Sequence, residues 1–221
     1  MDQAYSILQK AATGWGVALS PEQLSQVDRY LKELLTANKR TNLTADTDPE
    51  TVIFRHVADG LAAAGVLIKE VSRPAPRILD LGAGGGYIGM AVKIAWPQAR
   101  VTLMESVQRK YRFLNAMAVR CALPGLTVAL CRAGEGPPCG REKGFDAVVA
   151  RALAPLPEAA DLALPLADAQ GLVLLFQSVL PDPEEPELRR VLARHAARLV
   201  KSVPYRLPQE GRDRYLALFR R

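Results

Sequence analysis

The segment from Ile78 to Gly89 holds the residues best suited to bind a ligand. A short apolar run containing Asp80 is followed by glycines at alternate positions, Gly82, Gly84 and Gly86, and then by helix-forming residues from Tyr87 onward. This order predicts a strand, a tight glycine turn and a helix. Glycines allow a positive φ and let a ligand approach the backbone without meeting a Cβ atom. The first N–H groups of the helix lack helical partners and face whatever lies over the turn.

Asp80 helps to decide which ligand this turn suits. Gly84, Gly86 and Gly89 match the spacing Gly-x-Gly-x-x-Gly, which alone is weak evidence for a nucleotide site. An acid two residues before the first glycine can accept hydrogen bonds from a cationic or hydroxylated ligand, but it would place a further negative charge near a pyrophosphate. The pattern therefore favours S-adenosylmethionine over a nicotinamide dinucleotide. A glycine turn with a purely structural role is the alternative.

The composition is that of a folded, mildly basic chain. Its 221 residues, 49% of them hydrophobic, suit one large domain or one domain with a helical appendage. We expect a cytoplasmic protein without a membrane segment, because no signal-peptide pattern and no uncharged apolar run of spanning length is found. The net charge of +6 suits a polyanion such as nucleic acid. The three cysteines include no Cys-x-x-Cys pair, and we expect no metal site.

The order of predicted elements divides the chain into two parts. Residues 1–70 are predicted to form an N-terminal helical extension, with Ser20, Pro21 and Gln23 capping one helix and Asp48 and Pro49 opening another. Residues 71–221 alternate strands with helices and end in a hairpin. This pattern predicts an α/β, doubly wound, mostly parallel sheet of the seven-stranded methyltransferase type, which is Rossmann-like. The strands are expected near residues 78–81, 100–105, 126–131, 145–150, 171–176, 199–207 and 215–219.

Several chemically useful residues follow directly after predicted strands. Ligands in such sheets bind beyond the carboxyl ends of the strands, where we expect the glycine turn, Glu105, residues 133–135 and Arg151 to meet. Glu105, about 20 residues past the glycines, is placed to accept both ribose hydroxyls of an adenosine. Arg151 is expected to line the cofactor and substrate side, so that Arg151→Ala would lose activity with little change in stability. A structural ion pair with a nearby acid is its alternative.

A second group of polar residues lies in the helical part. His56 and Asp59 are three residues apart on one predicted helix, and together with Asn42 they are candidates for a polar cluster. A histidine beside an acid is more often a structural pair, so the residues alone favour a role in organising the domain.

Separated motifs give the chain a resemblance to a known family. It resembles the glucose-inhibited division protein B family, bacterial enzymes that methylate N7 of a guanine in 16S ribosomal RNA. The matching motifs are Asn42-Leu43-Thr44, Arg55-His56-x-x-Asp59, Asp80-Leu81-Gly82-Ala83-Gly84, Glu105-Ser106 with Arg109-Lys110, Arg151-Ala152-Leu153 and Arg214-Tyr215-Leu216.

The resemblance implies a cofactor, a substrate and the residues that bind them. S-adenosylmethionine would be held by Asp80, Gly82, Gly84, Gly86, Tyr87, Glu105, Ala133, Gly134, Glu135 and Arg151. The substrate, 16S rRNA or the small ribosomal subunit, would be contacted by Asn42, His56, Arg109, Lys110 and Arg214. The enzyme is expected to act as a monomer. No catalytic base is expected, because guanine N7 carries a lone pair and no proton.

Departures from the family pattern keep two other functions open. Glu105 replaces the more usual aspartate, Gly60 stands where a serine is usual, and Gly134 stands where an acid is common, with Glu135 one position on. Gln177 and Ser178 replace a Lys-Gly pair, which removes a cation near the expected substrate entrance. A methyltransferase acting on a small molecule or a protein is the first alternative, and a nucleotide-binding module without catalysis is the second.

Overall fold

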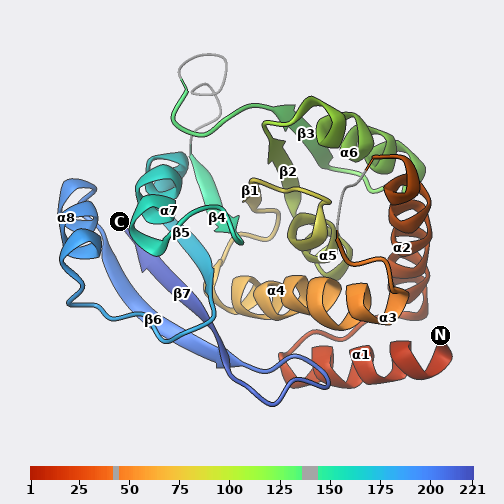
Figure 1. Ribbon diagram of the computed structural model, residues 1–221. Coiled ribbons are helices and arrows are strands. Elements are labelled where there is room, and N and C mark those ends of the chain that lie inside the picture. The colour runs from red at the N-terminus through yellow and green to blue at the C-terminus, as the bar shows by residue number, and fades with distance from the viewer. Residues whose placement is uncertain (42–44, 136–143) are drawn as a thin grey trace.

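The computed structural model describes residues 1–41, 45–135 and 144–221, and Asn42 lies outside these ranges. Before the first strand, the elements formed by the described residues are all helices, as predicted (Figure 1). The elements of this part are α1 (Asp2–Gly14), α2 (Pro21–Thr41), α3 (Pro49–Thr51), the π-helix η1 (Val52–Val57) and α4 (Ala58–Glu70).

Both predicted helix starts are confirmed. Ser20 Oγ accepts a hydrogen bond from the Gln23 N–H at 3.2 Å, and Gln23 Oε1 accepts one from the Ser20 N–H at 2.8 Å. This reciprocal pair satisfies two backbone donors at the start of α2. Asp48 caps the next helix, where its carboxylate accepts from the Thr51 N–H at 2.7 Å.

The helical segment from Pro49 to Glu70 lies at the centre of the core. It has 22 residues, and its most apolar 18-residue stretch has a mean hydropathy of 1.5, so its length and composition alone would suit a membrane span, a feature not singled out in the sequence. However, 72% of its most apolar stretch is buried inside the fold, which identifies it as a core helix. Within it, between α3 and α4, η1 is a π-helix, a wider turn that occurs often near functional sites.

The described residues form a seven-stranded sheet in the order β3-β2-β1-β4-β5-β7-β6, which confirms the predicted fold class. Strands β3, β2, β1, β4 and β5 pair in parallel, and β7 is antiparallel to β5 and β6. The strands are β1 (Arg77–Leu81), β2 (Arg100–Glu105), β3 (Leu126–Leu130), β4 (Phe145–Ala150), β5 (Ala167–Gln177), β6 (Arg198–Tyr205) and β7 (Arg214–Arg220). The remaining helices are α5 (Tyr87–Ala95), α6 (Gln108–Arg120), α7 (Leu156–Ala163), the short 3₁₀ turn η2 (Leu164–Leu166) and α8 (Pro186–Arg194).

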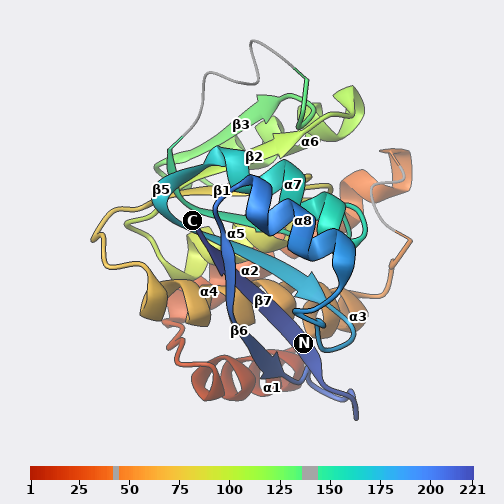
Figure 2. The same cartoon turned by 90° about the vertical axis from the view of Figure 1, so that its left-hand side faces the viewer.

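Helices cover both faces of the sheet, and neighbouring residues of each central strand point into different cores. On β1, Ile78 packs with the core beneath α4, α5 and α6, whereas Leu79 packs with the core beneath α7 and α8. Figures 1 and 2 show α7 and α8 on one side of the sheet and α1, α2, α4 and α5 on the other. Burial on both faces explains why the strands read as continuous apolar runs in the sequence.

Two boundaries differ from the sequence prediction. β5 begins at Ala167 rather than near Gly171, because Phe145 of β4 pairs with Ala167 across a register shift. β6 begins at Arg198, one residue before the expected start, because Arg198 already pairs with Arg220.

The order in which strands are added to the sheet reverses between β1 and β4: β2 and β3 lie on one side of β1, and β4 and β5 lie on the other. β1 pairs with β2 on one side and with β4 on the other, so that Ile78 lies between Val101 and Ala147. α5 and α6 follow β1 and β2 on one face, whereas α7 follows β4 on the opposite face. At such a switch point the loops separate and leave a crevice at the carboxyl ends of the strands.

Candidate functional site

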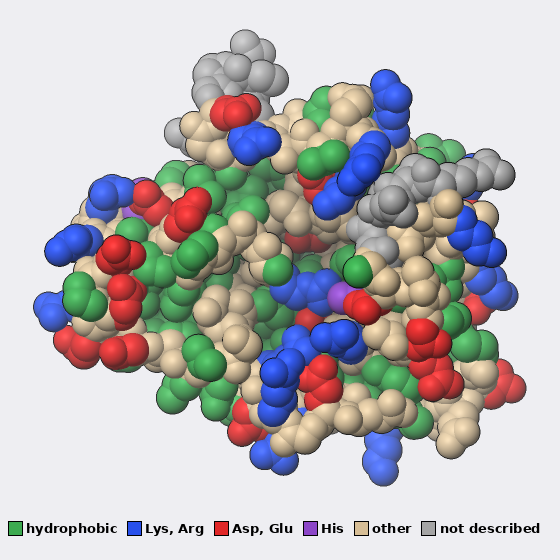
Figure 3. All heavy atoms as spheres, viewed as in Figure 1, with side chains coloured by type: hydrophobic (Ala, Val, Ile, Leu, Met, Phe, Trp, Pro, Cys, Tyr) green, Lys and Arg blue, Asp and Glu red, His purple; other side chains and the backbone are tan. Residues whose placement is uncertain are grey.

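A cavity of about 210 Å³ lies at the carboxyl ends of β1 and β4. Figure 3 shows this face of the molecule, where Lys and Arg side chains and a histidine lie around a hollow near the centre. The cavity is lined by Asp80, Gly82, Ala83, Gly84, Gly85, Tyr87, Ile88, Lys110, Arg151 and Ala152. It therefore brings together five of the residues predicted to bind a cofactor and one predicted to bind the substrate.

The glycine turn is left-handed at three positions. Gly82, Gly84 and Gly86 have φ values of 75°, 59° and 84°, which an L side chain rarely adopts. A Cβ atom on Gly84 would come no nearer to another atom than 3.9 Å, so the space above this residue is open to a ligand. Gly89 has a different role, because a Cβ there would lie 2.2 Å from Leu103. It allows α5 to pack closely on β2.

Two carboxylates accept hydrogen bonds from backbone N–H groups of this turn and of the helix that follows it. Asp80 Oδ2 accepts a hydrogen bond from the Gly89 N–H at 2.7 Å. Glu105 accepts from the Gly84 N–H at 2.8 Å through one oxygen and from the Val107 N–H at 2.8 Å through the other. We call Asp80, residues 82–87 and Glu105 the glycine-loop wall.

Burial changes the acid strength of Asp80. The side chain is 2% exposed, and loss of hydration raises its pKa to about 6, against the lowering effects of the Gly89 hydrogen bond and of the Arg151 charge. The nearby Glu105 charge acts in the same direction as burial. Asp80 is thus a carboxylate that a cationic ligand would help to ionise.

The proposed ribose contact of Glu105 stays a prediction. Glu105 does end β2 beside the turn, as expected, and it is 5% exposed. Each of its oxygens already accepts one backbone hydrogen bond, which the sequence did not predict. A carboxylate oxygen has a second lone pair, so these backbone hydrogen bonds, which we call the Glu105 brace, are compatible with a ribose contact.

The opposite side of the cavity is built around Arg151. Its Nη1 atom lies 2.6 Å from Asp59 Oδ2 and its Nη2 atom lies 2.9 Å from His56 Nδ1. Its guanidinium is also 5.3 Å from the centre of the Tyr87 ring. Both interpretations of Arg151 are thus present in one residue, which lines the cavity and pairs with an acid.

His56 is held between Arg151 and Asp46. Because a guanidinium only donates, Nδ1 of His56 must accept, and Nε2 must carry the proton that faces Asp46 Oδ2 at 2.7 Å. Burial and the Arg151 charge lower the pKa of His56, which favours this neutral form. The ring stacks on Tyr87 with centroids 4.3 Å apart. The predicted polar cluster of His56 and Asp59 therefore exists, although Arg151 joins them.

The C-terminal hairpin completes this network. Tyr205 Oη donates to Asp59 Oδ1 at 2.6 Å, and Arg214 lies 3.5 Å from Asp59 Oδ2. Arg214 also pairs with Glu210 through two nitrogens at 2.9 Å. We call Asp46, His56, Asp59, Arg151, Tyr205 and Arg214 the arginine wall. Asp46, Tyr205 and Glu210 were missed in the sequence: Tyr205 meets Asp59 across 146 positions, and no motif marks Asp46 or Glu210.

The other predicted residues lie outside the lining of the cavity. Gly86 caps α5 within the turn, and Arg109 is exposed in the first turn of α6. Ala133, Gly134 and Glu135 follow β3, where Glu135 forms an exposed ion pair with Arg132 at 3.4 Å. Asn42 is outside the described residues. Their roles toward a ligand stay predictions.

The structure explains one departure from the family pattern. A Cβ atom on Gly60 would lie 2.5 Å from the Cβ of Ala91 and 2.9 Å from the carbonyl oxygen of Tyr87. Gly60 therefore allows α4 to approach the start of α5, and a serine would not fit here without a shift. Gln177 directs its Nε2 atom to the carbonyl of Phe176 at 2.7 Å, and nothing in the structure explains its presence in place of lysine.

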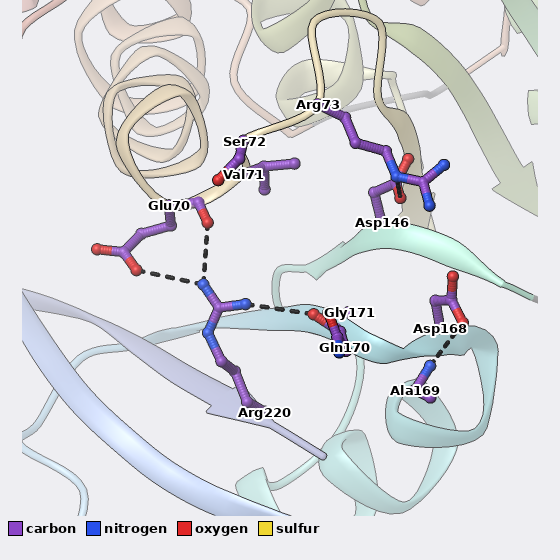
Figure 4. Close-up of a pocket in the computed structure, with 10 residues that line it drawn as sticks. All are labelled: Glu70, Val71, Ser72, Arg73, Asp146, Asp168, Ala169, Gln170, Gly171 and Arg220. Carbon is purple, nitrogen blue, oxygen red and sulfur yellow. Dashed lines mark hydrogen bonds and ion pairs between the residues drawn. The ribbon is translucent and has the colours of Figure 1, made fainter.

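A larger cavity of about 460 Å³ lies at the opposite, amino-terminal edge of the parallel strands (Figure 4). Four of its charged side chains form ion pairs, Arg220 with Glu70 and Arg73 with Asp146. These pairs join the end of α4 to the sheet. We place the functional site at the smaller cavity, because ligands of doubly wound sheets bind at the carboxyl edge.

The chain matches the family model described as rRNA small subunit methyltransferase G over residues 23–206. It is similar to the ribosomal RNA small subunit methyltransferase G of Sorangium cellulosum, with 39% identity over 191 residues that cover 85% of this chain and 78% of that protein. The protein of the same name from Rubrobacter xylanophilus is 35% identical over 214 residues, which cover 96% of this chain and 80% of that one.

A solved structure supports the fold independently. Magnesium protoporphyrin IX methyltransferase from Synechocystis with bound S-adenosylmethionine superimposes with a TM-score of 0.60 and 14% identity, covering 88% of this chain and 96% of that chain. At this identity the likeness shows the fold alone. The match to the family model and the identity shared with its members over most of their length show more: this chain belongs to the rRNA small subunit methyltransferase G (GidB) family.

Proposed function

We propose that this protein transfers a methyl group from S-adenosylmethionine to N7 of a guanine in 16S ribosomal RNA. The observation that carries the proposal is the cavity between β1 and β4, with an open glycine turn on one side and Arg151 on the other. It lies at the switch point of a methyltransferase sheet, in a chain of a ribosomal RNA methyltransferase family.

The residues of the cavity fit the cofactor. The open space above Gly84 accommodates a ligand against the backbone, and the buried Asp80 suits a cationic one. The cavity is smaller than the roughly 300 Å³ at which small-molecule sites usually begin. We therefore infer that only part of the cofactor enters it, and that the adenosine extends along the strand ends toward Glu105.

The reaction does not require the protein to act as a general acid or base. When bound, S-adenosylmethionine supplies a methyl group on a sulfonium, which the N7 lone pair takes in line as the carbon–sulfur bond breaks and its electrons stay on sulfur. No proton moves, because N7 carries none. The chain's task is to hold both partners aligned, which is worth up to about 7–11 kcal/mol. Tyr87, Lys110 and Arg151 line the cavity where this alignment would occur.

The substrate must present its guanine outside a regular helix. N7 lies in the deep groove of A-form RNA, which side chains cannot read, so we expect a target in a loop or irregular region. Lys110 on the cavity and the exposed Arg109 beside it are the predicted phosphate contacts. We further propose that the enzyme acts in the cytoplasm, as a monomer and without a membrane, on ribosomal RNA or the small subunit.

A tritium-transfer assay tests both the substrate class and the modified atom. Small subunits, naked 16S rRNA and total protein, all from a bacterial strain lacking its own family member, are each incubated with the enzyme and methyl-labelled S-adenosylmethionine. The label should enter rRNA. Borohydride and aniline should then cleave the product at one position, because borohydride reduces the cationic base of 7-methylguanosine, the reduced base is lost, and aniline breaks the chain at the abasic ribose.

Two results would contradict the proposal. Label confined to the protein fraction, or absent from all three, would favour a methyltransferase with another substrate. Labelled rRNA without a new aniline cleavage would retain the substrate and remove the N7 assignment. Gly84→Val serves as the control, since it should not bind the cofactor.

A further inference from the structure

Arg151 lies at the end of β4 and lines the cavity, but the residues that hold its guanidinium, Asp59 and His56, belong to other elements. Asp59 provides the shortest contact, at 2.6 Å, and this carboxylate is 1% exposed. A buried carboxylate keeps its charge only when its oxygens are satisfied by charges and hydrogen bonds. The orientation of Arg151 therefore depends on what holds Asp59.

Tyr205 satisfies the other Asp59 oxygen. Its Oη lies 2.6 Å from Oδ1, opposite the oxygen used by Arg151. Burial and the neighbouring Asp59 raise the pKa of Tyr205, so the hydroxyl stays protonated and donates. The carboxylate is thereby fixed at both oxygens, which sets the plane in which Arg151 can bind.

The Tyr205 ring is itself held in place. It meets Trp15 of the segment after α1 edge to face at 6.3 Å and Phe176 of β5 edge to face at 6.4 Å. Tyr205 is 6% exposed and ends β6, far from the glycine turn in the sequence. A rigid aromatic ring thus carries the hydroxyl to Asp59.

We propose that Tyr205 is a positioning residue for the methyl-transfer site, acting through Asp59 on Arg151. It touches neither cofactor nor substrate. Its hydroxyl fixes the Asp59 carboxylate, Asp59 and His56 fix the guanidinium, and the guanidinium faces the ligand. The C-terminal hairpin would in this way contribute to a cavity built by the ends of β1 and β4. This inference rests on the proposed function only in assuming that S-adenosylmethionine occupies that cavity.

Tyr205→Phe removes the hydroxyl and keeps both ring contacts. We expect it to weaken S-adenosylmethionine binding, measured by calorimetry, by about tenfold, the order of effect for a lost hydrogen bond to a charged group. Tyr5→Phe is the matched control, because Tyr5 Oη donates to Asp28 at 2.9 Å between α1 and α2, away from the cavity. It should lower the melting temperature similarly and leave cofactor affinity unchanged.

A double mutant separates positioning from general loosening. In an Arg151→Ala background, Tyr205→Phe should cause no further loss of cofactor affinity, because its effect passes through the missing guanidinium. Unchanged affinity in Tyr205→Phe, an equal loss in Tyr5→Phe, or an additive loss in the double mutant would each overturn the inference. Calorimetry needs no RNA, so a failure here is distinct from a failure to methylate rRNA.

Discussion

The glycine-loop wall is held by hydrogen bonds between residues 9 and 21 positions apart, whereas the contacts of Arg151 and Tyr205 in the arginine wall join residues 92 to 146 positions apart. In the first, carboxylates accept from backbone N–H groups. In the second, His56 and Asp59 of the helical part hold the guanidinium of Arg151, and Tyr205 of the C-terminal hairpin holds Asp59. The first wall is thus a local consequence of strand, turn and helix, and the second exists only after the whole chain has folded.

The sharpest way to break the arginine wall is to remove its centre. Arg151→Ala should abolish methyl transfer and lower the free energy of unfolding by about 3 kcal/mol, because Asp59 would remain buried with its closest cation gone. The sequence alone predicts little loss of stability, so the structure revises this expectation. Activity assays and chemical denaturation measure the two effects.

Adding Asp59→Asn to this variant provides the control. It removes the buried charge that has lost its closest cation, and most of the lost stability should return while activity stays absent. If Arg151→Ala is as stable as the wild type, the ion pair with Asp59 contributes less than the geometry implies.

The glycine-loop wall should be broken most completely at Gly84. Gly84→Val places a branched side chain in the open space of the cavity and at a φ of 59°, which costs about 1–3 kcal/mol for such residues. Calorimetry should detect no S-adenosylmethionine binding. Gly14→Val, at a position where a Cβ meets nothing within 4 Å, should bind normally. Measurable binding by the Gly84 variant would mean that the ligand does not lie over the turn.

The same contrast explains what the sequence predicts. The strand, the glycine turn and the acids Asp80 and Glu105 were predicted because their spacing is local and their residue types have few other uses. Arg151 was singled out by its place after a predicted strand, and His56 and Asp59 by their spacing on a predicted helix, but their contacts with one another were not predicted. Tyr205 and Asp46 look like ordinary polar residues in the sequence, and only the packing of β6 and α4 brings Tyr205 to Asp59. The brace of Glu105 on Gly84 was missed because its position suggested only a ribose contact.

A smaller effect should come from Glu105, which tests whether the brace supports the cavity. Glu105→Gln leaves one acceptor oxygen for two backbone N–H groups, and one lost bond should lower the free energy of unfolding by about 1–3 kcal/mol. Cofactor affinity should fall several-fold. Glu185→Gln is the matched control, since Glu185 accepts from the N–H groups of Glu187 and Leu188 at the start of α8. It should lower stability without changing affinity, and an equal loss of affinity in both would contradict the local role of Glu105.

The smallest expected effect separates the two walls by their response to pH. The pKa of Asp80 is raised from 3.8 to about 6, so between these values the folded protein binds a proton that the unfolded chain has lost. Its contribution to stability is therefore complete below pH 3.8 and is lost as the pH rises through 6. His56 acts in the opposite direction, because its pKa is lowered, and its contribution is lost as the pH falls below 6.5.

A cationic cofactor should lower the pKa of Asp80 and release part of a proton when it binds near pH 6. Calorimetry in two buffers of different ionisation enthalpy measures this release, which should disappear in Asp80→Asn and persist in His56→Gln. Release that persists in Asp80→Asn and disappears in His56→Gln would assign the coupling to the arginine wall instead, and with it the main charge contact of the cofactor.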